Sequence, residues 1–112
     1  MRPGQAAHQA LCLHLCALGI AHEVEYPWGA QLTPPRRFRA DVAVPERRLL
    51  VEVVGGAHLA GRAKLYADTE RTRLAVMAGW VILPFSPPEA HDGTAALEVQ
   101  RWLSSATERR VP

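Results

Sequence analysis

Residues 49–54, Leu-Leu-Val-Glu-Val-Val, restrict the fold of this chain more than any other stretch. A nearly continuous apolar run of this length is typical of a β-strand that is covered on both faces. Glu52 interrupts the run. A carboxylate inside a buried strand is costly unless a partner neutralises it or it binds a cation. The fold must therefore supply Glu52 with a positive charge.

Residues 38–44 predict a second strand directly before this one. Apolar side chains stand at every second position from Phe38 to Val44, which is the period expected of a half-buried strand. The charged stretch Pro45-Glu46-Arg47-Arg48 then breaks the pattern, as a hairpin turn does. In such an antiparallel hairpin the side chains of Asp41 and Glu52 can approach one another.

Two converging carboxylates have two interpretations, and the residues alone leave both open. Hard divalent cations such as Mg²⁺ and Mn²⁺ prefer oxygen ligands, so Asp41 and Glu52 would form a metal site. Alternatively, each carboxylate pairs with one of the nearby arginines, five of which fall within residues 36–48.

The rest of the chain has clear periodic patterns. They predict helices at residues 5–18, 62–78 and 94–104 and further strands at 20–28 and 80–85, with Ser86–Glu89 as a short loop and a fraying tail at 105–112. The helix at 62–78 has its apolar stripe widened by Val76 and Met77. Cys12 and Cys16 share one helix face and are expected to be buried small hydrophobic residues. Trp28 is expected in the core, with base stacking from an exposed loop as the alternative.

Size and charge favour one intracellular domain. A chain of 112 residues with 48% hydrophobic content can bury one core and leaves no room for a second domain. The net charge of +2 is mild, but the arginine cluster suits bidentate contact with phosphate groups. With no signal peptide or membrane-spanning segment apparent, we expect a cytoplasmic protein without a membrane partner. The minimal size would also suit a phage-encoded protein acting in the host cytoplasm.

The order of these motifs resembles the PD-(D/E)XK nuclease superfamily, and within it the small group similar to very-short-patch-repair endonucleases. The resemblance rests on Arg39-Ala-Asp41, Leu50-Val-Glu52 with Gly55-Gly56-Ala-His58, Asp68-Thr-Glu-Arg71 and Gly79-Trp80, and it covers roughly residues 18–90. It implies an α/β fold with a restriction-endonuclease-like core, in which helices flank a mixed four-stranded sheet. The fourth strand would join in parallel.

The resemblance also implies a function and a set of site residues. The protein would be a Mg²⁺- or Mn²⁺-dependent DNA endonuclease acting as a homodimer, structure-selective in the manner of a Holliday-junction resolvase or a nickase. Asp41, Glu52 and the carbonyl of Val53 would hold the metal, and His58 or Lys64 would assist the chemistry. The residues that would position DNA are Arg36, Arg37, Arg39, Arg62, Arg71 and Arg73.

Three departures from the family pattern support an alternative function. The first helix carries His8 and Gln9 where relatives often have an acid. Val54 replaces the motif lysine, and the aspartate that the small group commonly has at that point after Glu52 is missing too. Arg73 also stands where relatives often have asparagine. The alternative is a catalytically inactive nuclease fold that binds DNA. A scaffold with incidental arginines is a third reading, and it predicts no salt-sensitive DNA affinity.

Overall fold

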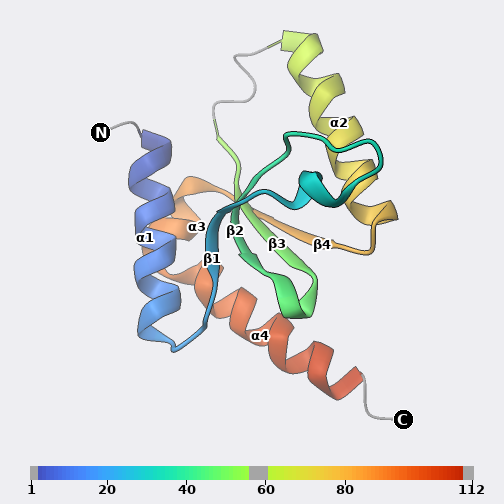
Figure 1. Cartoon of the computed structure of the whole chain (residues 1–112). Helices are drawn as coiled ribbons and strands as arrows, with labels where there is room; N and C mark the ends of the chain where they lie inside the picture. Colours follow the sequence, from blue (N-terminus) through green and yellow to red (C-terminus); the bar gives the residue numbers. More distant parts are fainter. Residues whose placement is uncertain (1–2, 56–60, 110–112) are drawn as a thin grey trace.

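The structure is a computed structural model that describes residues 3–55 and 61–109 (Figure 1). Its helices and strands, in chain order, are α1 (Pro3–Ala17), β1 (Glu23–Tyr26), β2 (Ala40–Val44), β3 (Leu49–Val53), α2 (Gly61–Met77), β4 (Val81–Phe85), α3 (Pro87–Asp92) and α4 (Thr94–Arg109). Short 3₁₀ helices lie at Trp28–Gln31 and Pro45–Arg47.

The four strands form one mixed sheet in the order β1-β2-β3-β4. β1 and β2 are antiparallel, β2 and β3 are antiparallel, and β3 and β4 are parallel. Helices flank this sheet, so the predicted α/β class with a mixed four-stranded sheet is confirmed (Figure 1).

The β2–β3 hairpin turns through a residue in an unfavourable backbone conformation. Arg48 has φ 55°, in the left-handed region that side chains other than glycine rarely adopt. Its guanidinium lies 4.1 Å from the centre of the Trp80 ring and donates to the carbonyl of Ala78. These contacts hold the turn against the start of β4 and offset the cost of the backbone conformation.

One face of the sheet packs against α1, α3 and α4 (Figure 1). Strand residues such as Val42 and Val51 contact Leu11 and Leu15 from α1 and Val99 from α4, and all five are fully buried. The two-residue period of the strands and the three-to-four-residue period of the helices put these side chains on facing surfaces.

The opposite face is covered by α2 and by the loop between β1 and β2. Trp28 from this loop is 1% exposed and stacks on Phe38, with ring centres 5.2 Å apart. The expectation that Trp28 belongs to the core is therefore confirmed. Gly29 makes this packing possible, because a Cβ atom there would lie 2.7 Å from the carbonyl oxygen of Arg36.

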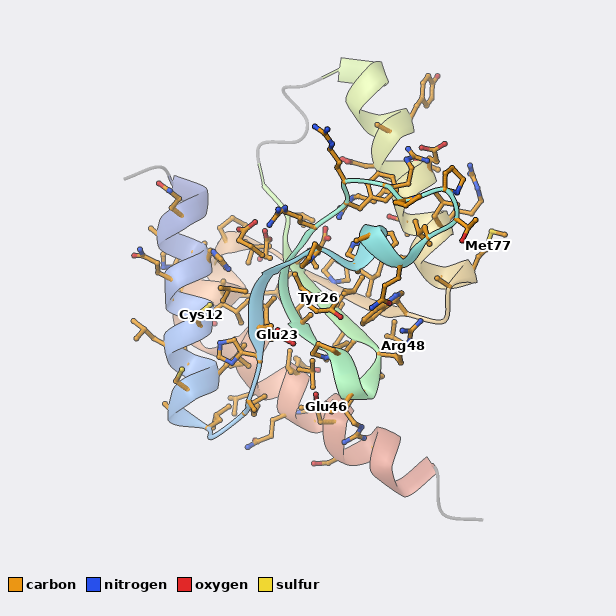
Figure 2. The ribbon with its side chains drawn as sticks, viewed as in Figure 1. Cys12, Glu23, Tyr26, Glu46, Arg48 and Met77 are labelled. Carbon is orange, nitrogen blue, oxygen red and sulfur yellow. The ribbon has the colours of Figure 1, made fainter. Side chains whose placement is uncertain are left out.

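Helix α2 covers its face of the sheet with fewer apolar residues than the sequence predicts. Among the described side chains of α2, Ala75 is the only one that is fully buried, and Leu74 is partly buried beside it. Val76 and Met77 are 60% and 75% exposed, so the prediction that they widen the buried stripe is wrong. Each successive residue turns about 100° around the helix axis, which carries Met77 away from the sheet (Figure 2).

The segment after β4 is a helix and not the predicted loop. Ser86 accepts a hydrogen bond from the backbone N–H of Glu89, and the Glu89 side chain accepts from the backbone N–H of Ser86. This capping box satisfies free N–H groups at the start of α3, and a proline at its first position already has a helical φ. Helix α4 then extends to Arg109, beyond its predicted end at Ser104.

The two cysteines lie on one face of α1, as predicted, but differ in burial. Cys12 is half-buried, whereas Cys16 is exposed, so the expectation of burial is wrong for Cys16. Both are free thiols. Burial raises the pKa of the Cys12 thiol, and the nearby Cys16 and Asp41 raise it further. Cys12 is therefore protonated and weakly nucleophilic at neutral pH.

The outer edge of β4 contains a proline. The N–H of Val81 donates to the carbonyl of Arg48, on the side of β3, so alternate N–H groups along β4 face β3. Pro84 falls in the other set and therefore takes a donor away from the free edge. No helix within residues 3–55 and 61–109 is long and apolar enough to cross a membrane.

Candidate nucleic-acid and metal site

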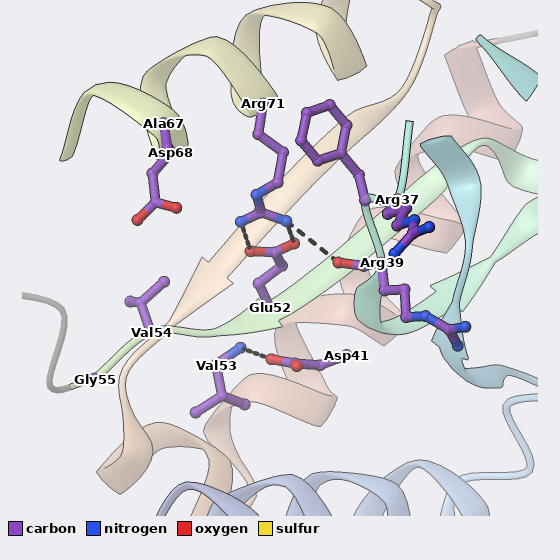
Figure 3. Close-up of a pocket in the computed structure, with 11 residues that line it drawn as sticks. Arg37, Arg39, Asp41, Glu52, Val53, Val54, Gly55, Ala67, Asp68 and Arg71 are labelled. Atoms are coloured by element: carbon purple, nitrogen blue, oxygen red, sulfur yellow. Dashed lines mark hydrogen bonds and ion pairs between the residues drawn. The ribbon is translucent and has the colours of Figure 1, made fainter. Parts of the chain in front are cut away.

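A pocket of about 440 Å³ opens between β3, α2 and the segment that precedes β2. Figure 3 shows its residues. Its charged lining consists of Arg37, Arg39, Asp41, Glu52, Asp68 and Arg71. Three arginines face three carboxylates, so the formal charges of the described lining cancel.

The hairpin places Asp41 and Glu52 in adjacent strands at the same level. Val42 is paired with Val51, so Asp41 and Glu52 are the next residues along β2 and β3. The Oδ2 atom of Asp41 accepts a hydrogen bond of 2.9 Å from the backbone N–H of Val53 (Figure 3). This bond fixes the carboxylate beside the last residue of β3. Both residues line the same pocket, with the Asp41 carboxylate on the N–H of Val53 and the Glu52 carboxylate on Arg71.

His8 supports Asp41 from the other side of the sheet. Its Nε2 atom lies 2.9 Å from the backbone carbonyl oxygen of Asp41 and therefore donates to it. The imidazole of His8 is thus held on the main chain of β2 and anchors α1 to the strand that carries the carboxylate.

Glu52 is 8% exposed, and its two carboxylate oxygens accept hydrogen bonds from the two terminal nitrogens of Arg71, which belongs to α2 (Figure 3). The planar guanidinium matches the carboxylate in a two-bond arrangement, which is the strongest form of this ion pair. Hydrogen bonding to Glu52 raises the pKa of Arg71, partial burial opposes the rise, and Asp68 and Asp41 add to it. For Glu52, the arginine pairing left open by the sequence is therefore the one observed.

Arg71 reaches this position because of helix spacing. Asp68 and Arg71 are three residues apart in α2, and both line the pocket (Figure 3). Arg71 also donates to the backbone carbonyl of Arg39 at 3.3 Å. The guanidinium consequently links α2 to both β3 and the segment before β2.

The other predicted DNA-binding arginines have different environments. Arg36 pairs with Glu70 at 2.7 Å and lies over the Phe38 ring, which joins the loop to α2. Arg37 and Arg39 are exposed at the mouth of the pocket. Arg73 is exposed on α2 and lines a second depression with Asp68, Thr69 and Thr72.

Comparisons with models of protein families, with curated proteins and with solved structures found no match. The resemblance drawn from the sequence motifs stays a prediction, and the site has to be judged from its own chemistry.

Several predicted site residues lie outside what the structure describes. His58 falls in residues 56–60, and the side chains of Arg62 and Lys64 in α2 are also not described. Val54, at the position where the resemblance expects a lysine, is 48% exposed and lines the pocket. Val53 also lines the pocket, and its backbone N–H donates a hydrogen bond to the Asp41 carboxylate.

The donors at this site suit a hard divalent cation in part. No group of three or more His, Cys, Asp or Glu side chains with metal-binding geometry occurs among the described residues. Mg²⁺ needs fewer, because it commonly takes one or two carboxylates and fills its remaining positions with water. Asp41 and Glu52 fit that requirement in chemistry, provided that Arg71 gives up at least one oxygen of Glu52.

Two lining residues are absent from the predicted site. Phe38, predicted as part of a strand, lies before β2 and forms a wall of the pocket. Asp68, which belongs to the Asp-x-x-Arg motif, has a side chain that points into the pocket (Figure 3). The spacing of Asp68 and Arg71 was the available signal, since residues three apart share a helix face.

Proposed function

We propose that this protein is a metal-dependent DNA endonuclease, with its active site in the pocket formed by β3, α2 and the segment before β2. The observation that carries the proposal is the placement of Asp41 and Glu52 at the same level of adjacent strands, at a pocket with exposed arginines at its mouth. Two carboxylates and two exposed arginines in one pocket are suited to hold a divalent cation next to a phosphodiester.

In this mechanism Asp41 and Glu52 would hold the cation, and Arg37 and Arg39 would orient the DNA backbone. Mg²⁺ or Mn²⁺, when bound, would supply a water of lowered pKa and stabilise negative charge on the phosphate. The bond from Val53 fixes the Asp41 carboxylate in place. Arg37 and Arg39 contact phosphates without reading base sequence, so a structural feature of DNA, such as a branch or a nick, would select the substrate.

Charge balance links DNA affinity in the pocket to the cation. Without a cation the three arginines and three carboxylates of the described lining cancel, so together these six residues attract phosphate weakly. A divalent cation gives the same pocket an excess of two positive charges. DNA affinity at this site should therefore rise when Mg²⁺ or Mn²⁺ is added, whereas added salt ordinarily lowers the affinity of a protein for DNA.

The test is a cleavage assay on labelled linear duplex, single-stranded DNA and a four-way junction, each with Mg²⁺, Mn²⁺ or a chelator. We expect cutting that needs the metal and that favours one of these substrates. Absence of cutting with every metal and substrate would overturn the nuclease proposal. A homodimer, also proposed, would appear by sedimentation as a species of twice the monomer mass.

Val54→Lys should increase the rate of cleavage. Val54 lines the pocket and is 48% exposed, so a lysine there extends into solvent with little cost to folding. Its ammonium group would stabilise charge on the reacting phosphate, an effect of roughly tenfold or more. The measurement is the single-turnover cleavage rate, with Val24→Lys, an equally exposed strand valine on β1, as the matched control. An unchanged or lower rate in Val54→Lys would contradict the prediction.

A catalytically inactive DNA-binding domain is the second candidate. It is favoured by Val54 at the lysine position and by the engagement of both Glu52 oxygens with Arg71. Such a domain would bind DNA equally well with metal or with chelator. The two candidates therefore differ in the metal dependence of binding as well as in cutting.

A further inference from the structure

Arg71 occupies the place where a cation at this site would be most strongly attracted. Its guanidinium is bonded to both oxygens of Glu52, and the negative charges of Asp68 and Asp41 act on it as well. Asp68 and Arg71 come from the same helix face, and Asp41 from the neighbouring strand. The arginine thus serves as the counter-ion of the whole acidic group.

A divalent cation and Arg71 compete for the same oxygens. Both oxygens of Glu52 are taken by Arg71, and Glu52 is 8% exposed, so solvent cannot easily replace a lost partner. Cation binding to Glu52 therefore requires that the guanidinium move away from at least one of them.

The released guanidinium has a favourable new partner close by. Arg71 lines the open pocket with Arg37 and Arg39. A phosphodiester placed there offers two oxygens to the same planar fork that Glu52 now fills.

We propose that Arg71 is a positioning residue that closes the Glu52 metal site until a phosphodiester draws it away, so that cation and DNA backbone bind cooperatively. This inference rests on the proposed function, because it assigns the ligands of the same pocket. Linkage makes the effect reciprocal, so phosphodiester strengthens cation binding by the factor by which the cation strengthens phosphodiester binding.

The test measures Mn²⁺ affinity without DNA, from the electron paramagnetic resonance signal of free Mn²⁺. Arg71→Gln removes the competing cation and should tighten Mn²⁺ binding by roughly five- to 100-fold. Arg71→Lys keeps the charge but loses the two-bond fork, so an intermediate tightening is expected. Arg101→Gln removes the same charge from an exposed position of α4, away from this pocket, and should leave the affinity unchanged.

A purely structural Arg71 would give the opposite result. Its loss would leave Glu52 misplaced, and Mn²⁺ affinity would be unchanged or weaker in a folded Arg71→Gln. That result would overturn the proposal. So would equal tightening in Arg101→Gln, or no Mn²⁺ binding by any variant. If thermal melting shows Arg71→Gln unfolded, Arg71→Lys decides: tightening supports the proposal and an unchanged affinity overturns it.

The outcome is separable from the cleavage assay. Tighter Mn²⁺ binding by Arg71→Gln with no cutting by the natural chain would keep the cooperative site and reject the nuclease. Cutting by the natural chain with an unchanged Mn²⁺ affinity in Arg71→Gln would keep the nuclease and reject the cooperative site.

Discussion

Asp41→Asn should abolish metal-dependent cutting while leaving the fold intact. The substitution removes a negative charge from the cation site but keeps an oxygen that accepts the 2.9 Å bond from the N–H of Val53. In the proposed mechanism Asp41 holds the catalytic cation, so its loss should lower the cleavage rate by at least roughly 100-fold. The measurement is the single-turnover rate with saturating Mg²⁺, together with the thermal midpoint of unfolding.

Asp92→Asn is a matched control for this prediction. Asp92 also accepts a backbone N–H bond, from Thr94 at 2.8 Å, but it lies at the end of α3 and does not line the pocket. Its substitution should leave cutting unchanged. Full activity in Asp41→Asn would remove the two-carboxylate site from the proposed mechanism, and equal losses in both variants would indicate a general effect of charge.

Trp28→Ala should cost about 3–5 kcal/mol of the free energy of unfolding. Trp28 is among the largest fully buried side chains, and it packs with Phe38 between the sheet and the loop that precedes β2. Its removal leaves a cavity where the sheet, the loop and α2 meet. Denaturant titration followed by circular dichroism measures the loss.

Two further variants sharpen this test. Trp28→Phe keeps an aromatic ring, and the Nε1 atom has no hydrogen-bond partner among the described residues, so a smaller loss of roughly 1–2 kcal/mol is expected. Tyr66→Ala removes an aromatic ring that is 66% exposed and should cost less than about 0.5 kcal/mol. A stable Trp28→Ala with weakened DNA binding would instead support the base-stacking role.

The order of the elements could be predicted from the sequence because it depends on local patterns. The apolar run at Leu49, the alternation before it and the Pro45 turn specify the hairpin, and its register follows from which side chains are apolar. Helix α3 is harder to predict, because its two prolines favour a loop, although Ser86 and Glu89 stand at capping-box spacing.

The partner of Glu52 could not be predicted, for a physical reason. The sequence shows that a buried carboxylate needs a positively charged partner, but it contains several arginines that could be this partner. The packing of α2 over the sheet decides between them, because it places Arg71 beside Glu52 and Arg36 beside Glu70. The exposure of Cys16 is equally hard to predict, because an apolar pattern around a helix does not indicate which part of the helix the sheet covers.

The proline in β4 limits how this molecule can assemble. A sheet grows by adding a strand to a complete row of N–H and C=O groups, and Pro84 leaves a gap in the row on one outer edge. The other outer strand, β1, has four residues and a left-handed Glu25 (φ 50°), which breaks the regular spacing of its groups. Neither border of the sheet is a good template for joining two copies into a continuous sheet or a fibre. A pair of molecules would have to meet through helices or loops, which leaves both sheets separate and each pocket on its own copy.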